Sequence, residues 1–260
     1  MHDDPFDDAE EIRSNIPSAA PKDGQAVMLR TTQWLDLGHD DPRMPPAFVI
    51  AFSVAAFTTS AFEQHGVPFP ATLQKAVPKR QAEFLMGRLA ARHAIEHLGV
   101  AAAAPGIGTS REPLWQTGVT GSITHTKDMA GAIAVDSSTV HGIGIDIENV
   151  VDADARRALE ALAITAEERA LLEARREHLS VDAILTIAFS AKESFFKGTF
   201  GTVGRYFDFS AARVTSLHVN SGRLTLTLEE DLAPALPKGR SFTVCFRMLT
   251  LDTVVTSFVW

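Results

Sequence analysis

The C-terminal part of the chain alternates apolar and polar side chains, and this period of two limits the possible folds more than any other feature. From about residue 211 onward, the alternation covers residues 223–228, 241–248 and 254–260. Such alternation is typical of antiparallel strands that bury one face. The chain therefore has to build part of its core as a sheet.

Helical periodicity dominates three segments that precede these strands, at residues 79–98, 153–178 and 181–197. Pro78 directly before the first segment and Gly99 after its last turn are start and stop signals for a helix. Thr165 and Glu168 form a capping-box pattern inside the second segment. We expect Gly198 to end the third helix.

Strand propensity returns at residues 47–57, 130–135 and 142–148. The last two segments flank a turn at residues 136–138, so we expect them to form a hairpin. The order strand, helix, strands, helices, strands predicts an α+β fold in two halves, with a junction near residues 140–150.

These signals divide the chain into three parts. Residues 1–25 are acidic and contain several prolines, and we expect a loose tail there. An N-terminal half then covers residues 26–143, and a C-terminal half covers residues 144–260.

Composition narrows the classes of function. The chain carries 24 Lys and Arg against 32 Asp and Glu, a net charge of −8, which argues against nucleic acid as the main partner. Cys245 is the single cysteine, so neither a disulfide within the chain nor a two-cysteine metal site can form. The N-terminus is acidic, and no apolar run reaches the roughly 18–20 residues of a membrane span. We expect a cytoplasmic protein.

Two acidic residues end an apolar run that has strand character. Successive side chains of a strand alternate between its faces, so Asp146 and Glu148 point to one side. Neighbouring carboxylates repel each other unless a cation offsets their charge, and Mg²⁺ is commonly held by one or two carboxylates together with substrate phosphates. The pair alone leaves a second interpretation open, in which two solvated acids end an exposed strand.

The helix predicted at residues 181–197 carries a polar face made of Thr186, Ser190, Glu193 and Lys197. Glu193 and Lys197 are four residues apart, which is also the spacing of an ordinary surface salt bridge. The functional interpretation is a third carboxylate for a metal beside a lysine for a phosphate.

Two further segments offer donors for phosphate. Residues 121–126 combine hydroxyls, a histidine and backbone N–H groups, although a turn with a structural histidine would have the same composition. The helix at 79–98 presents Arg80, Arg88 and Arg92 on one stripe with Phe84. Arginine matches phosphate well, although a solvated helix face would look similar.

Three ordered segments, residues 121–125, 144–148 and 189–197, resemble the signatures of 4′-phosphopantetheinyl transferases. Residues 79–88 and 111–115 resemble the branch of that family typified by enterobactin synthetase component D. The chain departs from the branch at Gln116, where a proline is usual, and at Phe189, where tryptophan is frequent. Neither difference removes a charged group.

The resemblance implies the large, surfactin-synthetase-activating class, with two similar α/β halves, antiparallel sheets and a coenzyme A cleft between the halves. It implies transfer of phosphopantetheine from coenzyme A to a serine of an apo carrier protein, with release of adenosine 3′,5′-bisphosphate. Carriers of non-ribosomal peptide, polyketide and fatty-acid synthases are the implied partners, in siderophore or other secondary metabolism. Two fused halves imply a monomer.

Carried over residue by residue, the resemblance implies that Asp146, Glu148 and Glu193 hold Mg²⁺, with Mn²⁺ as a substitute. Asp146 also belongs to the coenzyme A site through the metal on the diphosphate. Glu193 is the implied base for the serine, directly or through a metal-bound water, and Lys197 binds the diphosphate.

The resemblance also implies a site for the 3′-phosphate of coenzyme A, formed by Arg80, Arg88, Thr124 and His125. Arg111, Lys75 and Lys79 are alternatives for a further cation at this phosphate. Apolar residues after the helix, at Phe200, Tyr206 and Phe207, either dock the carrier protein or belong to the core.

Two other functions remain open from the residues. One is a different Mg²⁺-dependent phosphotransferase, although the chain lacks a P-loop pattern. The other is a non-catalytic module that binds coenzyme A or a carrier protein, which the presence of all three carboxylates disfavours.

Overall fold

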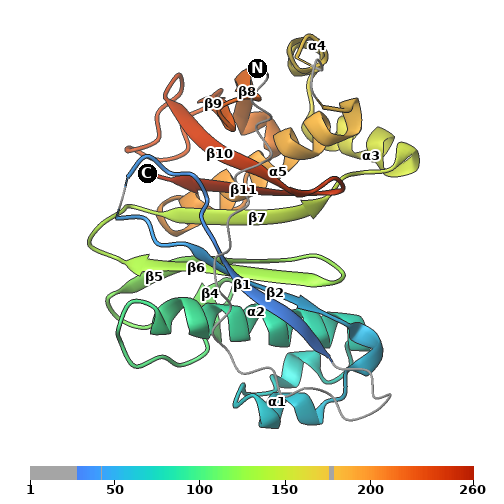
Figure 1. The fold of residues 1–260 in the computed structure, drawn as a ribbon. Coiled ribbons are helices and arrows are strands. Elements are labelled where there is room, and N and C mark those ends of the chain that lie inside the picture. Colours follow the sequence, from blue (N-terminus) through green and yellow to red (C-terminus); the bar gives the residue numbers. More distant parts are fainter. Residues whose placement is uncertain (1–27, 42, 176–178) are drawn as a thin grey trace, which may run out of the picture.

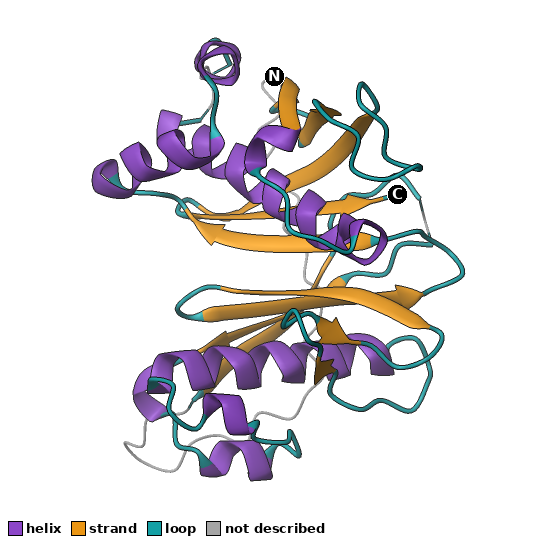
Figure 2. Cartoon of the chain, turned by 180° about the vertical axis from the view of Figure 1, so that it is seen from behind, coloured by secondary structure: helices purple, strands orange, loops and turns teal. Residues whose placement is uncertain are grey.

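The computed structural model describes residues 28–41, 43–175 and 179–260, and it contains two antiparallel sheets that each carry one long helix (Figure 1). The layers follow the order helix, sheet, sheet, helix, so that the two sheets lie against each other in the middle of the molecule (Figure 2). The tail predicted at residues 1–25 lies outside the described residues.

The first half combines a four-stranded sheet with the long helix α2. Its strands are β1 (Leu29–Leu35), β2 (Ala47–Phe52), β5 (Val119–His125) and β6 (Met129–Asp136), in the order β1-β2-β6-β5. Its helices are the 3-10 helix η1 (Val54–Ala56), α1 (Ser60–Gln64), the 3-10 helix η2 (Ala71–Leu73) and α2 (Pro78–Glu96). The short strands β3 (Gly106–Ile107) and β4 (Pro113–Leu114) pair with each other.

The second half combines a five-stranded sheet with the long helix α5. Its strands are β7 (Ile143–Asn149), β8 (Ala212–His218), β9 (Arg223–Leu228), β10 (Ser241–Thr250) and β11 (Thr253–Val259), in the order β7-β11-β10-β9-β8. Its helices are α3 (Ala153–Ala163), α4 (Ala166–Glu173), α5 (Val181–Val203) and the 3-10 helix η3 (Phe209–Ala211). The C-terminal strands predicted from alternation are confirmed.

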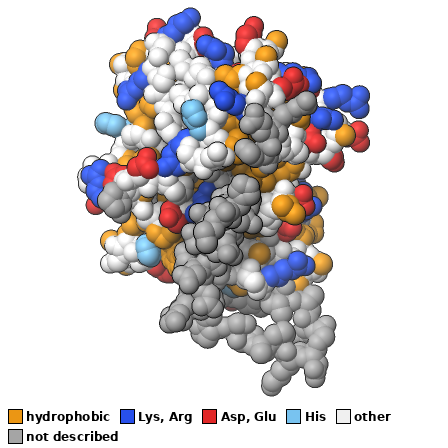
Figure 3. All heavy atoms as spheres, turned by 45° about the horizontal axis from the view of Figure 1, so that its top comes forward, with side chains coloured by type: hydrophobic (Ala, Val, Ile, Leu, Met, Phe, Trp, Pro, Cys, Tyr) orange, Lys and Arg blue, Asp and Glu red, His pale blue; other side chains and the backbone are white. Residues whose placement is uncertain are grey.

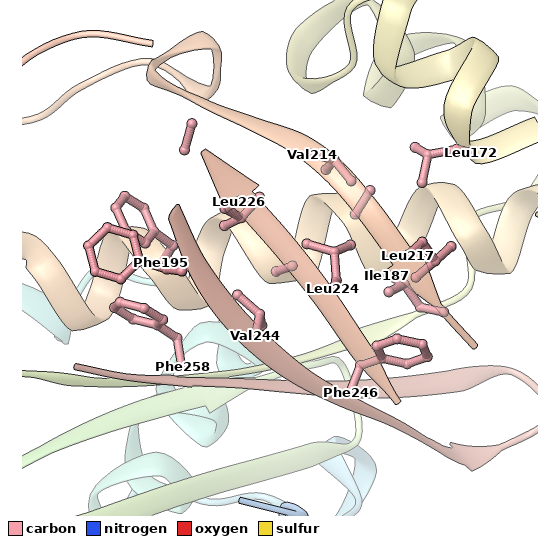
Figure 4. Packing of buried hydrophobic residues seen from close by; sticks show 14 of the residues in the cluster. Leu172, Ile187, Phe195, Val214, Leu217, Leu224, Leu226, Val244, Phe246 and Phe258 are labelled. Atoms are coloured by element: carbon pink, nitrogen blue, oxygen red, sulfur yellow. The ribbon is translucent and has the colours of Figure 1, made fainter. Parts of the chain in front are cut away.

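Apolar side chains fill the space between each helix and its sheet. In Figure 4, Ile187 and Phe195 of α5 lie in one layer with Leu224, Val244 and Phe258 from the strands. A third apolar cluster lies between the two sheets, where the β7 isoleucines meet side chains of β2 and β6. This arrangement confirms the predicted alternation of β7, because its isoleucines face the first sheet while its acids face α5.

Two predicted helix boundaries are wrong. The segment 153–178 is interrupted, because Ile164 is extended and Thr165 starts α4 with the predicted capping box to Glu168. Helix α5 does not end at Gly198 but continues to Val203, and the residue that caps it, Gly204, has a left-handed φ of 68°. Gly198 lies inside the helix, and it is a glycine because a side chain at this position would collide with Phe258. It is a packing residue and not a cap.

The hairpin predicted between residues 130–135 and 142–148 is also wrong. Strand β6 pairs with β2 and β5, whereas β7 pairs with β11. The turn at 136–138 therefore leads from one sheet to the other. Local turn chemistry was correct, since Asp136 accepts from Ser138, but the partner of each strand was decided by tertiary packing.

Helix α2 confirms the helix predicted at residues 79–98. Pro78 is its first residue, and Gly99 follows its end with a left-handed φ of 75°. No helix within residues 28–41, 43–175 and 179–260 is both long and apolar enough to span a bilayer. On the face seen in Figure 3, basic and acidic side chains are interspersed.

Candidate functional site

The Asp146 carboxylate lies at the seam between the halves, where β5, β7 and α5 meet, and it is 2% exposed. Its Oδ1 accepts hydrogen bonds from Thr124 Oγ1 at 3.1 Å and from Lys197 Nζ at 2.7 Å. Its Oδ2 accepts from Ser190 Oγ at 2.8 Å. One buried carboxylate is thus held by both halves of the chain.

The polar face predicted on α5 is present, and two of its residues reach this carboxylate. Ser190 and Lys197 contact Asp146 directly. Thr186 lies farther along the helix and accepts from the backbone N–H of Val151. The i, i+4 spacing brought these side chains to one side of the helix, and packing against β7 turned that side toward Asp146.

Glu148 and Glu193 are the other two predicted acids, and both are half-buried. The pKa of Glu148 is raised to about 7, first by burial and then by the charges of Asp146 and Glu193, while Lys197 opposes the rise. Burial likewise raises the pKa of Glu193, with Lys197 opposing and Asp146 adding to the rise. The three carboxylates therefore repel one another around a single ammonium group.

This set of oxygen donors fits a hard divalent cation in its chemistry, because a cation would offset both the cost of burying these acids in their charged form and their mutual repulsion. Within the part of the chain that the structure describes, however, no three His, Cys, Asp or Glu side chains are gathered closely enough to hold a metal ion. The positive charge beside Asp146 belongs to Lys197. A metal ion held by all three acids would therefore need their side chains to move closer together.

A second polar cluster lies between α2 and the end of β5. Arg80 Nη1 lies 2.6 Å from His125 Nε2, as expected when the guanidinium donates to a neutral imidazole. Burial lowers the pKa of His125, Glu83 opposes this shift, and Arg80 adds to it. Arg80 is exposed and His125 is half-buried, so both are accessible to an anion.

Glu83 is the acid that the sequence reasoning missed. It is 7% exposed, and its Oε2 lies 3.5 Å from Arg80 Nη1 and 3.7 Å from His125 Nδ1. Lys79 Nζ lies 3.8 Å from Oε1 of the same carboxylate. The spacing of three from Arg80 and four from Lys79 was visible in the sequence and could have identified this contact.

The expected basic stripe of α2 is not a solvated face. Arg88 is buried, stacks over the Phe84 ring with 4.7 Å from Cζ to the centroid, and donates to the Gly106 carbonyl at 2.9 Å. Arg92 instead donates to the carbonyl of His65. The stripe therefore divides, and Arg80 alone contacts His125.

Arg88 nevertheless has unused capacity for an anion. Its Nε is buried and finds no hydrogen-bond partner among the described residues. Burial and the charge of Arg80 lower its pKa to about 10. A phosphate near Arg80 would satisfy the free N–H and offset the repulsion between the two guanidinium groups.

Thr124 was expected in this cluster, but it lies outside it. It is 3% exposed, its hydroxyl donates to Asp146, and the same oxygen accepts from the backbone N–H of Ile147 at 3.0 Å. Thr124 and His125 are consecutive residues of a strand, so their side chains leave β5 on opposite faces. The structure therefore brings Thr124 to the carboxylates and His125 to Arg80.

Two cavities lie on either side of the stacked rings of Phe196 and Tyr206. The first, of about 310 Å³, is largely apolar and is bordered by Glu193. The second, of about 220 Å³, extends from Lys197 to the loop that contains Arg111. The Tyr206 hydroxyl donates to the Ser110 carbonyl at 3.1 Å and so connects this wall to the N-terminal half.

The remaining predicted residues are placed as follows. Arg111 lines the second cavity and has a left-handed φ of 69°, whereas Lys75 is exposed. Tyr206 is 67% exposed. Phe200 lines the second cavity, and Phe207 packs against the core while lining the first. The apolar residues after Lys197 thus include both exposed and core side chains.

Comparison with known proteins adds to this geometry. Residues 69–135 match the family model "4'-phosphopantetheinyl transferase N-terminal domain", and residues 142–245 match "4'-phosphopantetheinyl transferase superfamily". The chain is 34% identical to enterobactin synthase component D of Salmonella typhi over 212 residues, which are 79% of this chain and 86% of that protein. It is 34% identical to the 4′-phosphopantetheinyl transferase Svp of Streptomyces mobaraensis over 177 residues, 66% of this chain and 70% of that protein. It is also 34% identical to the 4′-phosphopantetheinyl transferase PptT of Mycobacterium tuberculosis over 143 residues, 55% of this chain and 61% of that protein.

Proposed function

Because the chain belongs to the 4′-phosphopantetheinyl transferase superfamily and transfers 4′-phosphopantetheine from coenzyme A to carrier proteins, we propose that its two halves divide the work on coenzyme A. The N-terminal half binds the 3′-phosphate end of the nucleotide. The C-terminal half binds the diphosphate and carries out the transfer. The observation that carries this proposal is the separation of charge across the seam. The guanidinium groups of Arg80 and Arg88 lie on one side with His125 as a neutral neighbour, and the acids Asp146, Glu148 and Glu193 lie on the other.

The reaction requires one bond to form and one to break. The serine Oγ of the carrier bonds to the phosphorus that bears pantetheine, and the bond from that phosphorus to the bridging oxygen breaks. The bridging oxygen leaves with the electron pair as part of adenosine 3′,5′-bisphosphate. The hydroxyl proton has to pass to a base, and the protein otherwise contributes positioning and charge.

Asp146, Glu148 and Glu193 are the residues that would hold Mg²⁺, or Mn²⁺ in its place. When bound, such a cation supplies positive charge to the diphosphate and to the leaving oxygen. Support comes from the raised pKa values of Glu148 and Glu193, which burial and, after it, neighbouring carboxylates make costly to ionise, a cost that a cation would offset. Lys197, which pairs with Asp146 and is 26% exposed at its side chain, would bind the diphosphate.

Glu193 is our candidate for the base. It borders the cavity of about 310 Å³, so a hydroxyl entering from that side would meet its carboxylate. Before a cation binds, burial raises its pKa, so the carboxylate takes up a proton more readily than an exposed glutamate does.

Arg80, His125 and Arg88 are proposed to bind the 3′-phosphate. The unpartnered Nε of Arg88 and the exposed guanidinium of Arg80 provide charge-assisted donors. Arg111 is the best placed of the three additional cations considered, because it lines the cavity that also contains Lys197. Lys79 is close to Glu83 and Lys75 is exposed.

The proposal is tested by incubating the protein with coenzyme A, Mg²⁺ and apo carrier proteins, and by measuring intact carrier masses. Peptidyl and acyl carriers form the panel, since several relatives are named enterobactin synthases. We expect a gain of one phosphopantetheine on the acceptor serine and none after serine-to-alanine substitution. Binding of coenzyme A without mass gain on any carrier would favour the non-catalytic module and contradict the proposal. Transfer of a phosphoryl group alone would indicate a different phosphotransferase.

A further inference from the structure

We infer that Thr124 and Ser190 are positioning residues that clamp the Asp146 carboxylate from the two halves of the chain, and that Thr124 is not a ligand of the nucleotide phosphate. The inference rests on the proposed function of Asp146 as a metal ligand. It assigns a role to a contact across the seam that the family signatures do not distinguish from phosphate binding.

The hydrogen-bond inventory of Thr124 supports this role. A threonine hydroxyl has one proton to donate and two lone pairs. The Ile147 N–H donates to Oγ1 at 3.0 Å, which leaves the hydroxyl proton directed to Asp146 Oδ1 at 3.1 Å. With the residue 3% exposed, no side-chain donor of Thr124 remains for a phosphate.

Ser190 holds the other carboxylate oxygen. Its Oγ donates to Asp146 Oδ2 at 2.8 Å, and the residue is fully buried. Thr256 lies 2.9 Å from the same hydroxyl and donates to the Ser190 carbonyl, which fixes the serine in place. The carboxylate plane is therefore defined by one donor from β5 and one from α5.

The clamp leaves capacity for a cation. A carboxylate has about four lone-pair directions, and the described residues use three of them, through Thr124, Lys197 and Ser190. Hydrogen bonds to ligating carboxylates orient them for the metal, and their removal typically weakens metal binding by about 10- to 100-fold.

Ser122 provides a matched control on the same strand. It precedes Thr124 by two residues, so the two side chains share a face. Its Oγ accepts from the Ile145 N–H at 3.0 Å, as Thr124 accepts from Ile147, and it is equally buried. Among the hydrogen bonds of the described residues, Ser122 makes none to Asp146. Both hydroxyls join the sheets, but only Thr124 also holds the carboxylate.

The experiment compares Thr124→Val, Thr124→Ser, Ser190→Ala and Ser122→Ala in the full chain. Mn²⁺ affinity is measured by electron paramagnetic resonance with saturating coenzyme A and no carrier protein. Coenzyme A affinity is measured by calorimetry in EDTA, and stability by urea unfolding.

We expect Thr124→Val and Ser190→Ala to weaken Mn²⁺ binding by about 10-fold or more while the affinity for coenzyme A in EDTA is unchanged. Thr124→Ser, which keeps the hydroxyl, should retain Mn²⁺ affinity. Ser122→Ala should lose stability but retain Mn²⁺ affinity. If Thr124→Val does not fold, Ser190→Ala tests the same clamp from the helix side.

Three outcomes would overturn the inference. Loss of coenzyme A affinity in EDTA with unchanged Mn²⁺ affinity would make Thr124 a phosphate ligand. An equal loss of Mn²⁺ affinity in Ser122→Ala would show that Thr124 affects the metal only by stabilising the packing of the two sheets, and not through its hydrogen bond to Asp146. Failure of the unmodified protein to bind Mn²⁺ would remove the proposed metal site itself, and the inference with it.

Discussion

The two halves of the molecule have the same layout, an antiparallel sheet covered by one long helix, but they carry opposite charge at the seam. The N-terminal half presents the guanidinium groups of Arg80 and Arg88 beside the neutral imidazole of His125, whereas the C-terminal half presents carboxylates around Asp146. Each half also holds one group of the opposite sign. Glu83 lies among the cations of the first half, and Lys197 lies among the acids of the second.

Because of this inversion of charge, the same layout of sheet and helix can bind two chemically different parts of one ligand. The single counter-charge in each half partly neutralises its cluster in the absence of ligand. We propose that an anionic ligand would replace Glu83 as the partner of the cations in the first half, and that a cation would replace Lys197 as the partner of the acids in the second. Substitutions in either half should remove this difference in charge or its consequences, and the largest effect is expected at Asp146.

Asp146→Asn should reduce carrier-protein transfer by at least about 100-fold, because the loss of metal-assisted charge stabilisation amounts to several kcal/mol. The change is measured by carrier mass at saturating coenzyme A. The Asp136→Asn variant is the control, since Asp136 is an exposed turn residue that accepts from Ser138. Wild-type rates in Asp146→Asn would show that the metal assignment is wrong.

Arg80→Ala should raise the KM for coenzyme A by about 10- to 100-fold with little change in kcat, because a charge-assisted hydrogen bond contributes about 1.5–3 kcal/mol. The same variant should have a much smaller effect on 3′-dephospho-coenzyme A. Arg157→Ala, on the exposed surface of α3, should leave both substrates unaffected. An equal loss with both substrates would place Arg80 away from the 3′-phosphate.

Glu148→Gln and Glu83→Gln should change the free energy of unfolding in opposite directions at pH 8. Glu148 has a folded-state pKa of about 7, above the ordinary value of 4.5, so its contribution is most favourable below pH 4.5 and is lost as pH rises through 7. Its replacement should stabilise the ligand-free protein by at most about 3 kcal/mol at pH 8, and by little at pH 4.5.

Glu83 is surrounded by cations, and its replacement should destabilise the protein by about 2 kcal/mol. Urea unfolding at pH 4.5 and pH 8 checks both variants. Stabilisation by Glu83→Gln, or destabilisation by Glu148→Gln at pH 8, would contradict the proposed charge inversion.

Tyr206→Phe should have the smallest effect, a loss of about 0.5–1 kcal/mol in unfolding free energy. The substitution removes the hydrogen bond to the Ser110 carbonyl while keeping the stack on Phe196. The measurement is again urea unfolding. No change at all would mean that this exposed contact does not help to join the halves.

The sequence pattern was sufficient to predict which way most side chains of the carboxylate site point. Strand alternation placed Asp146 and Glu148 on the face opposite the isoleucines, and helical spacing placed Ser190 with Lys197. These residues act within one element, so the period of that element determines their direction.

The contact partners of other residues were determined by tertiary packing, which the sequence pattern does not show. Thr124 was grouped with His125 by adjacency, but the seam directs its hydroxyl to Asp146. Arg88 has the spacing of a solvated stripe but is buried against Phe84. A glycine often follows the end of a helix, but Gly198 lies inside α5, where only a residue without a side chain fits against Phe258. In each case the partner comes from a distant part of the chain.

The division of labour between the halves is tested most directly by coenzyme A binding in EDTA, measured by calorimetry on Arg80→Ala and Asp146→Asn. We predict that Arg80→Ala weakens binding by about 10-fold or more, and that Asp146→Asn binds coenzyme A at least as tightly as the unmodified protein, because it removes a negative charge from the diphosphate site. Weak binding by Asp146→Asn together with unchanged binding by Arg80→Ala would contradict the account.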